Sequence, residues 1–321
     1  MIFTCIVDIS MKSSALLILV AIHVSCLVLS FQARPMPIRL GIQAWSSLYS
    51  QSKPSNHFDY LVIGAGSGGI ASARRAAGYG ANVAVIEGKN LGGTCVNVGC
   101  VPKKVMYNAG TVSEILEDAD NFGFKVETPK FDWLSLKTKR DKYISRLNAV
   151  YRNMLESSNI TLVPGQAVFS GPNSVNVDGK PYTADNILIA VGGRPSLPVS
   201  TDLPGVGHCI SSDAFFALES QPRAVAVIGA GYIGVELAGV FNALGSTTDL
   251  FTRRETLLSA QFDDMVVDAL AVEMKKRGVR HVPNQVVAQV IKDPADGTLT
   301  LLTLSGQKFG PYDQVRGICF F

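Results

Sequence analysis

Residues 60–69 read Tyr-Leu-Val-Ile-Gly-Ala-Gly-Ser-Gly-Gly, and this stretch decides the fold class. Four apolar residues typical of a short buried strand lead into a G-x-G-x-x-G turn. An alanine-rich helix is expected over 70–79, and a second strand over 82–86 ends on Glu87. Such glycines let a helix N-terminus approach a pyrophosphate, and the acid can accept hydrogen bonds from a ribose. The complete strand–helix–strand unit therefore favours a dinucleotide site over a turn that is merely tightly packed.

A second unit of the same kind is expected over 223–251. Its turn consists of Gly229, Ala230, Gly231, Tyr232, Ile233 and Gly234. Arg253 and Arg254 follow its second strand, at the place where the first unit has Glu87. An arginine there accommodates a 2′-phosphate, whereas an acid favours a free 2′-hydroxyl. The second dinucleotide is therefore predicted to be NADPH rather than NADH, the alternative being that the arginines are only a solvated strand end.

The remaining elements complete an α/β fold class with two Rossmann-like dinucleotide-binding domains. A polar helix is expected over 131–157, and short strands follow it. An apolar strand over 186–190 ends in Val-Gly-Gly-Arg-Pro, a turn that brings the backbone close to a ligand or to a neighbouring domain. We therefore predict one domain over 58–195 and a second over 196–321.

Cys95 and Cys100 belong to the most specific motif of the chain, Gly-Gly-Thr-Cys-Val-Asn-Val-Gly-Cys-Val-Pro-Lys-Lys. On a regular helix five positions correspond to a rise of about 7.5 Å, whereas the α-carbons of a disulfide lie about 4.4–6.8 Å apart. A disulfide would therefore need an irregular first turn, for which Gly99 and Pro102 are suited. The alternatives are a metal site and two buried free cysteines, but no further His or Cys stands nearby at the spacing of zinc ligands. The motif predicts a redox-active pair whose thiolate a helix start would stabilise.

The composition bounds the class of protein. A chain of 321 residues with 47% hydrophobic and 17% charged residues has room for about two domains. The net charge of +3 is too small and too scattered to indicate a nucleic-acid partner. Only one pair among the six cysteines is close in sequence, which argues against a secreted disulfide framework and favours a redox pair in a reducing compartment.

Residues 1–57 are predicted to be a targeting leader that precedes the fold. Its first part, 1–30, resembles a signal peptide, because the 17-residue uncharged run over 15–31 is short for a membrane span. Its second part, 31–57, lacks Asp and Glu and carries basic residues and serines, as transit peptides do. The tandem leader predicts delivery to a plastid, with no membrane span in the mature chain. A single mitochondrial or secretory leader and an uncleaved membrane anchor are the alternatives.

These motifs together resemble the pyridine nucleotide–disulfide oxidoreductases, over about 58–312 of this sequence. The resemblance implies that FAD binds the first unit, at Gly64, Gly66, Ser67, Gly68, Gly69, Glu87, Gly93, Thr94 and Gly192. It implies that NADPH binds the second unit, at Gly229, Gly231, Tyr232, Ile233, Gly234, Arg253 and Arg254. Lys103 matches a lysine beside the flavin, Glu236 matches its ion-pair partner, and Tyr232 matches an aromatic that covers the flavin until NADPH enters.

The resemblance also assigns roles in catalysis. Cys100 matches the thiol that contacts the flavin and Cys95 the thiol that attacks the substrate, and the glycines before Cys95 are expected to leave it the more exposed of the two. Within the family the chain is most similar to the glutathione reductases, because two lysines follow the proline of the redox motif and because of Arg253. The implied substrate is glutathione disulfide, and its candidate contacts are Ser67, Arg74, Tyr143 and Tyr151.

The C-terminal end departs from the family pattern. Residues 316–321 read Arg-Gly-Ile-Cys-Phe-Phe, where the resemblance implies a strand that continues into an Ala-Ile-Gly-Arg turn. The second domain is therefore expected to be incomplete, and the interface domain with its homodimer contacts and its His–Glu pair to be absent. We expect an NADPH-dependent glutathione-disulfide reductase whose chain, as given, is an incomplete or inactive fragment. The alternatives are a non-catalytic truncated nucleotide-binding isoform and a family member that reduces another disulfide.

Overall fold

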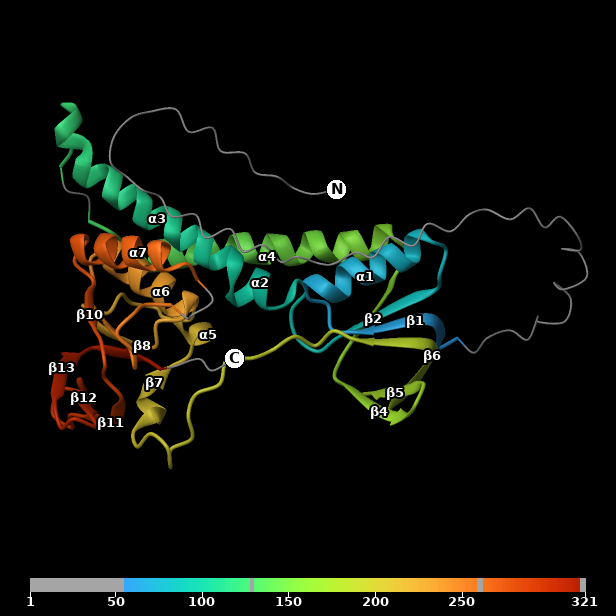
Figure 1. The fold of residues 1–321 in the computed structure, drawn as a ribbon. Helices are drawn as coiled ribbons and strands as arrows, with labels where there is room; N and C mark the ends of the chain where they lie inside the picture. The colour runs from blue at the N-terminus through green and yellow to red at the C-terminus, as the bar shows by residue number, and fades with distance from the viewer. Residues whose placement is uncertain (1–54, 128–129, 259–261, 318–321) are drawn as a thin grey trace, which may run out of the picture. The chain divides into compact units, whose positions relative to one another are not determined.

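The computed structural model describes residues 55–127, 130–258 and 262–317 (Figure 1). The predicted leader, and with it the expected plastid delivery, therefore lies outside the described residues except at its last three positions. Strand β1 (His57–Ile63) begins inside the predicted leader, because His57 is in register with Thr183 and its ring is 2.9 Å from the Thr183 hydroxyl. In the described part of the chain, no helix combines the length and the apolar character that a membrane crossing requires.

The first sheet has six strands in the order β3-β2-β1-β6-β5-β4. Besides β1 these are β2 (Val83–Glu87), β3 (Thr161–Pro164), β4 (Ala167–Gly171), β5 (Ser174–Val177) and β6 (Lys180–Ile189). Strands β1, β2, β3 and β6 run parallel, whereas β5 pairs antiparallel with both β4 and β6. Strand β6 begins six residues before the expected 186, because its first half forms a hairpin with β5. The parallel strands end at one edge, where β1 and β2 lead into candidate residues.

Four α-helices lie between or beside these strands in the described residues. They are α1 (Ser67–Gly78), α2 (Gly93–Val98), α3 (Cys100–Asp118) and α4 (Trp133–Ser157), and a short 3₁₀ helix, η1 (Ala119–Phe122), extends α3. Helix α1 and the C-terminal half of α4 pack on one face of the sheet, where Ile70, Ala73 and Leu155 are buried together. Helix α4 confirms the helix expected over 131–157 and begins after Asp132, whose side chain accepts a hydrogen bond from the N–H of Ser135 (2.9 Å).

The second sheet consists of five parallel strands in the order β10-β9-β8-β14-β7. They are β7 (Cys209–Ile210), β8 (Ala224–Ile228), β9 (Thr247–Phe251), β10 (Arg280–Val282) and β14 (Gln314–Arg316). Its helical segments are η2 (Val206–His208), α5 (Ser212–Phe215), α6 (Tyr232–Ala243) and α7 (Asp264–Lys276). A separate antiparallel sheet contains β11 (Val287–Lys292), β12 (Leu299–Thr303) and β13 (Lys308–Tyr312). The predicted α/β class with two Rossmann-like units is confirmed, although the first sheet also contains the antiparallel strands β4 and β5.

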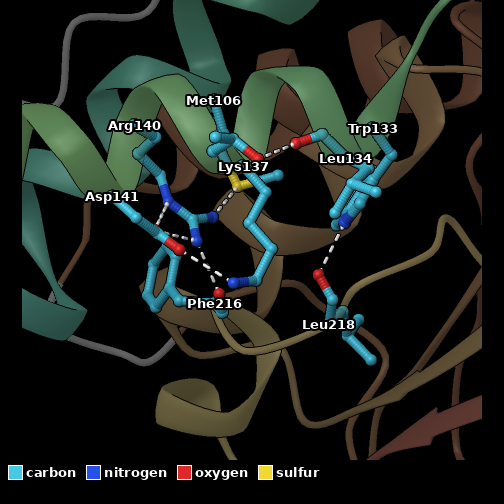
Figure 2. A network of polar contacts seen from close by, with 9 residues as sticks. Met106, Trp133, Leu134, Lys137, Arg140, Asp141, Phe216 and Leu218 are labelled. Atoms are coloured by element: carbon cyan, nitrogen blue, oxygen red, sulfur yellow. Dashed lines mark hydrogen bonds and ion pairs between the residues drawn. The ribbon is translucent and has the colours of Figure 1, made fainter.

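Helices α3 and α4 share an apolar core with the helices of the second sheet. Met106 of α3 and Trp133 of α4 are buried with Phe215 and Phe241. The Trp133 ring stacks on Phe241, with 6.1 Å between centroids and 7° between planes. Its Nε1–H donates a hydrogen bond to the carbonyl oxygen of Leu218 (2.8 Å; Figure 2). A common core therefore joins the two nucleotide units.

Arg140 of α4 adds a polar contact beside this core (Figure 2). Its guanidinium is buried and donates to the carbonyl oxygen of Phe216 (2.6 Å) and to the carboxylate of Asp141 (2.6 and 2.9 Å). Burial opposes ionisation of Asp141, but hydrogen bonds from Lys137 and Arg140 outweigh it and hold the pKa of that carboxyl below its ordinary value. The stabilisation from this ionised group is complete above the ordinary pKa and is lost as the pH falls through the lowered one.

Candidate redox site

The turn between β1 and α1 depends on glycine for its shape. Gly64 has a φ of +106°, and a Cβ there would lie 2.4 Å from the carbonyl oxygen of Ala190. A Cβ on Gly69 would lie 1.9 Å from the carbonyl oxygen of Gly64. Gly192, two residues beyond Ala190, also has a positive φ, +67°. The turn therefore leads directly into α1 and presents its first N–H groups at the edge of the sheet, a cradle that fits the pyrophosphate of FAD.

Glu87 closes this cradle from the end of β2. Its Oε2 accepts a hydrogen bond from the N–H of Ala65 (2.7 Å), and its Oε1 accepts one from the N–H of Lys89 (2.8 Å). A carboxylate has about four lone-pair sites, so two are still available to a donor such as a ribose hydroxyl.

The redox motif lies directly against the first glycine turn. The N–H of Gly92 donates to the carbonyl oxygen of Ala65 (2.8 Å). A Cβ on Gly93 would lie 2.7 Å from the α-carbon of Gly66, so Gly93 must be glycine for the two backbones to approach. Thr94 follows as an exposed residue of α2. The structure thus brings the residues predicted to bind FAD to one edge of the first sheet.

Cys95 and Cys100 form a disulfide across an interruption between two helices. Their α-carbons are 4.7 Å apart, inside the range that a disulfide requires. Gly99 separates α2 from α3 with φ −144° and ψ −118°, which confirms the predicted irregular turn. Cys100 is the first residue of the 19-residue helix α3, a position at which the helix N-terminus stabilises a thiolate.

The exposure of the two cysteines is the reverse of our expectation, because Cys100 is exposed and Cys95 is half-buried. The glycines before Cys95 do not open the motif. Gly92 packs so closely that a Cβ there would lie 2.6 Å from the Val96 side chain, and this contact holds α2 inward. Cys209, the free cysteine within the described ranges, is buried. Burial raises the pKa of its thiol to about 11, so it stays protonated at neutral pH and does not compete as a nucleophile.

Lys103 and Glu236 form the ion pair that the resemblance implied, with 2.8 Å between Nζ and Oε1. The pair connects the redox helix α3 to α6. Both side chains are about one-third exposed, 28% and 36%, so the pair contributes little stability of its own. Its effect is positional, because it fixes the first turns of α6, where Tyr232 lies one turn before Glu236 and is 44% exposed.

A cavity of about 370 Å³ lies at the second glycine turn. The whole turn from Gly229 to Gly234 lines it, and so do Arg253 and Arg254. Gly229 has a φ of +96°, and a Cβ on Gly234 would lie 2.0 Å from its carbonyl oxygen. The cavity therefore offers a helix N-terminus for a pyrophosphate and two cations for a 2′-phosphate, which fits NADPH.

Further polar residues line the same cavity, and they were not identified from the sequence. Thr252 and Gln285 reach it from outside the glycine turn, and Arg316 reaches it from the end of β14. Arg316 is buried, although it belongs to the segment that departs from the family pattern. Strand topology could have identified it: β14 pairs parallel with β8, so both strands end at the edge of the sheet where the second glycine turn begins.

We expect Gly234→Ala to weaken NADPH binding by about tenfold or more. The added methyl group would meet the carbonyl oxygen of Gly229, and overpacking of this kind costs about 1–3 kcal/mol. Calorimetric titration of the full chain with NADPH measures the effect. Gly239→Ala is the matched control, because Gly239 lies on the same helix and a Cβ there meets nothing within 4 Å. Equal affinities of the two variants would contradict the role of the close approach.

The residues predicted to contact the disulfide substrate lie on two helices. Ser67 and Arg74 are exposed on α1, and the Nε of Arg74 donates to the hydroxyl of Ser158 at the end of α4 (3.4 Å). Tyr143 and Tyr151 lie two turns apart on α4, about 12 Å along its axis. Tyr143 is 39% exposed, whereas Tyr151 packs against the core under the first sheet. Their joint role as a substrate site stays a prediction.

Comparison with known proteins supplies the family. Residues 58–316 match the model for pyridine nucleotide-disulphide oxidoreductases. The chain belongs to this family. A curated glutathione reductase from Yarrowia lipolytica is 49% identical over 250 residues. That alignment covers 74% of this chain and 52% of the relative, so the chain spans about half the length of the curated relative it matches.

Membership of the pyridine nucleotide-disulphide oxidoreductases implies FAD and NADPH as cofactors. Both glycine turns fit this implication, because in each of them a side chain would collide with neighbouring backbone and prevent the tight turn that leads into the helix N-terminus. Glu87, at the end of the second strand of the first unit, agrees with a cofactor that has no 2′-phosphate, as in FAD. Arg253 and Arg254, which follow the second unit, agree with a cofactor that has one, as in NADPH.

Proposed function

We propose that this chain serves the NADPH-dependent reduction of glutathione disulfide through FAD and the Cys95–Cys100 disulfide. The observation that carries the proposal is the position of that disulfide, which lies against the first glycine turn and is tied to the second unit by the Lys103–Glu236 ion pair. The 49% identity to a glutathione reductase supports the choice of substrate.

In the proposed reaction FAD, when bound, relays the two electrons of NADPH to the disulfide. The thiolate of Cys95 then attacks one sulfur of glutathione disulfide, which forms a mixed disulfide and releases one glutathione thiolate. The thiolate of Cys100 attacks the Cys95 sulfur, which restores the internal disulfide and releases the second glutathione. One NADPH and one proton are consumed, and two glutathione thiols are formed.

The residues of this chain contribute position and charge to these steps. The N-terminus of α3 and the cation of Lys103, one turn after Cys100, favour the thiolate form of that cysteine. Arg74 supplies an exposed cation for a glutathione carboxylate, and the α4 residues Tyr143 and Tyr151 supply hydroxyl groups. Arg253 and Arg254 select NADPH through its 2′-phosphate.

The family homodimer belongs to the same proposal. Large apolar side chains are exposed near the end of α3, at the end of η1 and just after it, namely Ile115 (62%), Phe122 (78%) and Phe124 (68%). Neighbouring apolar side chains at this exposure are typical of a surface that a second subunit covers.

A single-turnover experiment tests the function. The FAD-loaded chain is mixed with one equivalent of NADPH, and free thiols are counted before and after glutathione disulfide is added. We expect a gain of two thiols per chain after NADPH, and the loss of these two protein thiols together with release of two glutathiones after the substrate. Nucleotide binding without any gain of thiols would instead identify a non-catalytic nucleotide-binding chain. Faster reoxidation by cystine than by glutathione disulfide would identify a different substrate.

A further inference from the structure

Asn148 of α4 contacts the redox motif from outside it. Its Nδ2 donates to the carbonyl oxygen of Leu91 (2.7 Å) and to the Oδ1 of Asn97 (3.1 Å). Asn97 lies between the two cysteines, and its own Nδ2 donates to the carbonyl oxygens of Leu91 (3.0 Å) and Gly93 (2.8 Å). The two amides thus connect the start of α2 to α4.

Helix α4 is a firm support for this contact, because it is anchored on both sides of Asn148. Trp133 and Arg140 bind the carbonyl oxygens of Leu218 and Phe216 in the first two turns of the helix (Figure 2). Leu155 is fully buried under the first sheet near the other end. Asn148 therefore has a fixed position from which to hold the redox motif.

Helix α2 needs such support when the disulfide is open. It contains only six residues, which is too short for an isolated helix to be stable in water. The disulfide fixes α2 covalently to α3, but reduction removes that link. The dithiol form then depends on non-covalent contacts, and those of the buried Val96 and of the Asn97–Asn148 pair lie directly after Cys95.

We propose that Asn148 is a positioning residue that keeps Cys95 within bonding distance of Cys100 in the dithiol, and so favours the disulfide at equilibrium. Without the amide, α2 gains conformations in which the thiols are apart, and closing the disulfide then costs more conformational entropy. This inference deepens the proposed function and rests on Cys95 and Cys100 acting as its redox pair. The affected equilibrium is dithiol plus glutathione disulfide giving internal disulfide plus two glutathiones.

The test is the redox equilibrium of the full chain in glutathione buffers. Wild-type and Asn148→Leu proteins are equilibrated over a range of thiol-to-disulfide ratios, quenched by alkylation and digested with trypsin. The peptide 90–103 carries Cys95 and Cys100 and none of the other four cysteines, so its mass reports the oxidised fraction. We expect Asn148→Leu to lower the equilibrium constant for disulfide formation by about tenfold, a shift of about 30 mV towards easier reduction.

Asn153→Leu is the matched control, because Asn153 is exposed on the same helix. We expect its equilibrium constant for disulfide formation to equal that of the wild type. Asn148→Asp keeps the shape of the side chain but removes its donor, so it should shift in the same direction as Asn148→Leu. Melting temperatures of oxidised and reduced protein complete the cycle. The expected shift in the redox equilibrium requires that the Asn148 variants lose more stability in the oxidised form, because the reduced form can relax into the newly allowed conformations of α2.

Two results separate failure of the inference from failure of the proposed function. In the first, the wild-type pair changes redox state over the range, but both Asn148 variants have the wild-type redox equilibrium, and their oxidised and reduced forms lose stability equally. Asn148 is then only a structural residue, and the inference is overturned. If the wild-type pair does not change redox state over the whole range, the proposed redox function fails first, and the inference falls with it.

Discussion

Replacing Cys100 with serine is expected to abolish glutathione-disulfide reduction and, in the FAD-loaded protein, the long-wavelength absorbance that a thiolate beside a flavin produces. Replacing Cys95 with serine is expected to abolish reduction but to keep that absorbance. Either variant leaves one thiol, which cannot complete the second exchange, so the loss of turnover is complete rather than partial. The remaining thiols differ, because Cys100 begins the long helix α3 whereas Cys95 lies inside the short helix α2.

Visible spectra of both variants over a pH titration distinguish the two roles. Cys209→Ser is the control, because that thiol is buried and should affect neither property. The experiment is decisive because Cys100, not Cys95, is the more exposed cysteine, and exposure therefore gives no separate support to the assignment. An absorbance band that survives in Cys100→Ser and disappears in Cys95→Ser would reverse the roles. Loss of flavin binding in both would make the pair structural.

Arg253→Glu is expected to shift the preference of the second unit from NADPH towards NADH by about a hundredfold in the ratio of dissociation constants. A charge-assisted hydrogen bond to the 2′-phosphate contributes about 1.5–3 kcal/mol, and the new carboxylate adds repulsion towards that group. The same carboxylate can accept a hydrogen bond from the free 2′-hydroxyl of NADH, as acids at this position do. Calorimetric titrations of the full chain with each cofactor at low ionic strength measure the ratio, since salt screens exposed charges.

Arg152→Glu is the matched control for that charge reversal, because Arg152 is an exposed arginine of α4 outside the cavity. It changes the net charge of the chain equally, so it isolates any general electrostatic effect on an anionic ligand. An unchanged ratio in Arg253→Glu would mean that the arginine is only a solvated end of the second unit. A shift of equal size in Arg152→Glu would assign the preference to overall charge.

The parts of the site that the sequence predicts are those whose geometry is local. Gly64 and Gly229 each need a positive φ directly after a strand, and only glycine adopts it without strain, so the spacing of these residues reveals both turns. The interruption at Gly99 was predictable for the same reason, since five helical positions do not bring two cysteines within disulfide distance. The ion pair between α3 and α6 was accessible only through the family resemblance.

Asn148 and Arg140 illustrate what the sequence does not reveal. Both bind backbone carbonyl oxygens far away in the chain, at Leu91 and Phe216, and every residue has such an oxygen, so no residue type marks the partner. The exposure of the cysteines was misjudged because packing across the fold decides it, not the glycines beside them. Arg316 was missed because the cavity depends on a strand that returns to the sheet after three others intervene.

The core shared by Met106, Trp133, Phe215 and Phe241 bears on how this chain can be divided. A recombinant piece that begins at residue 196 would keep both phenylalanines and lose the indole stacked on one of them, so a wide apolar surface would face water. A piece that ends at residue 195 would expose the indole instead. A gene rearrangement that transfers one nucleotide unit without the other would expose the same apolar core to water. Helices α3 and α4 therefore favour the inheritance of both units together.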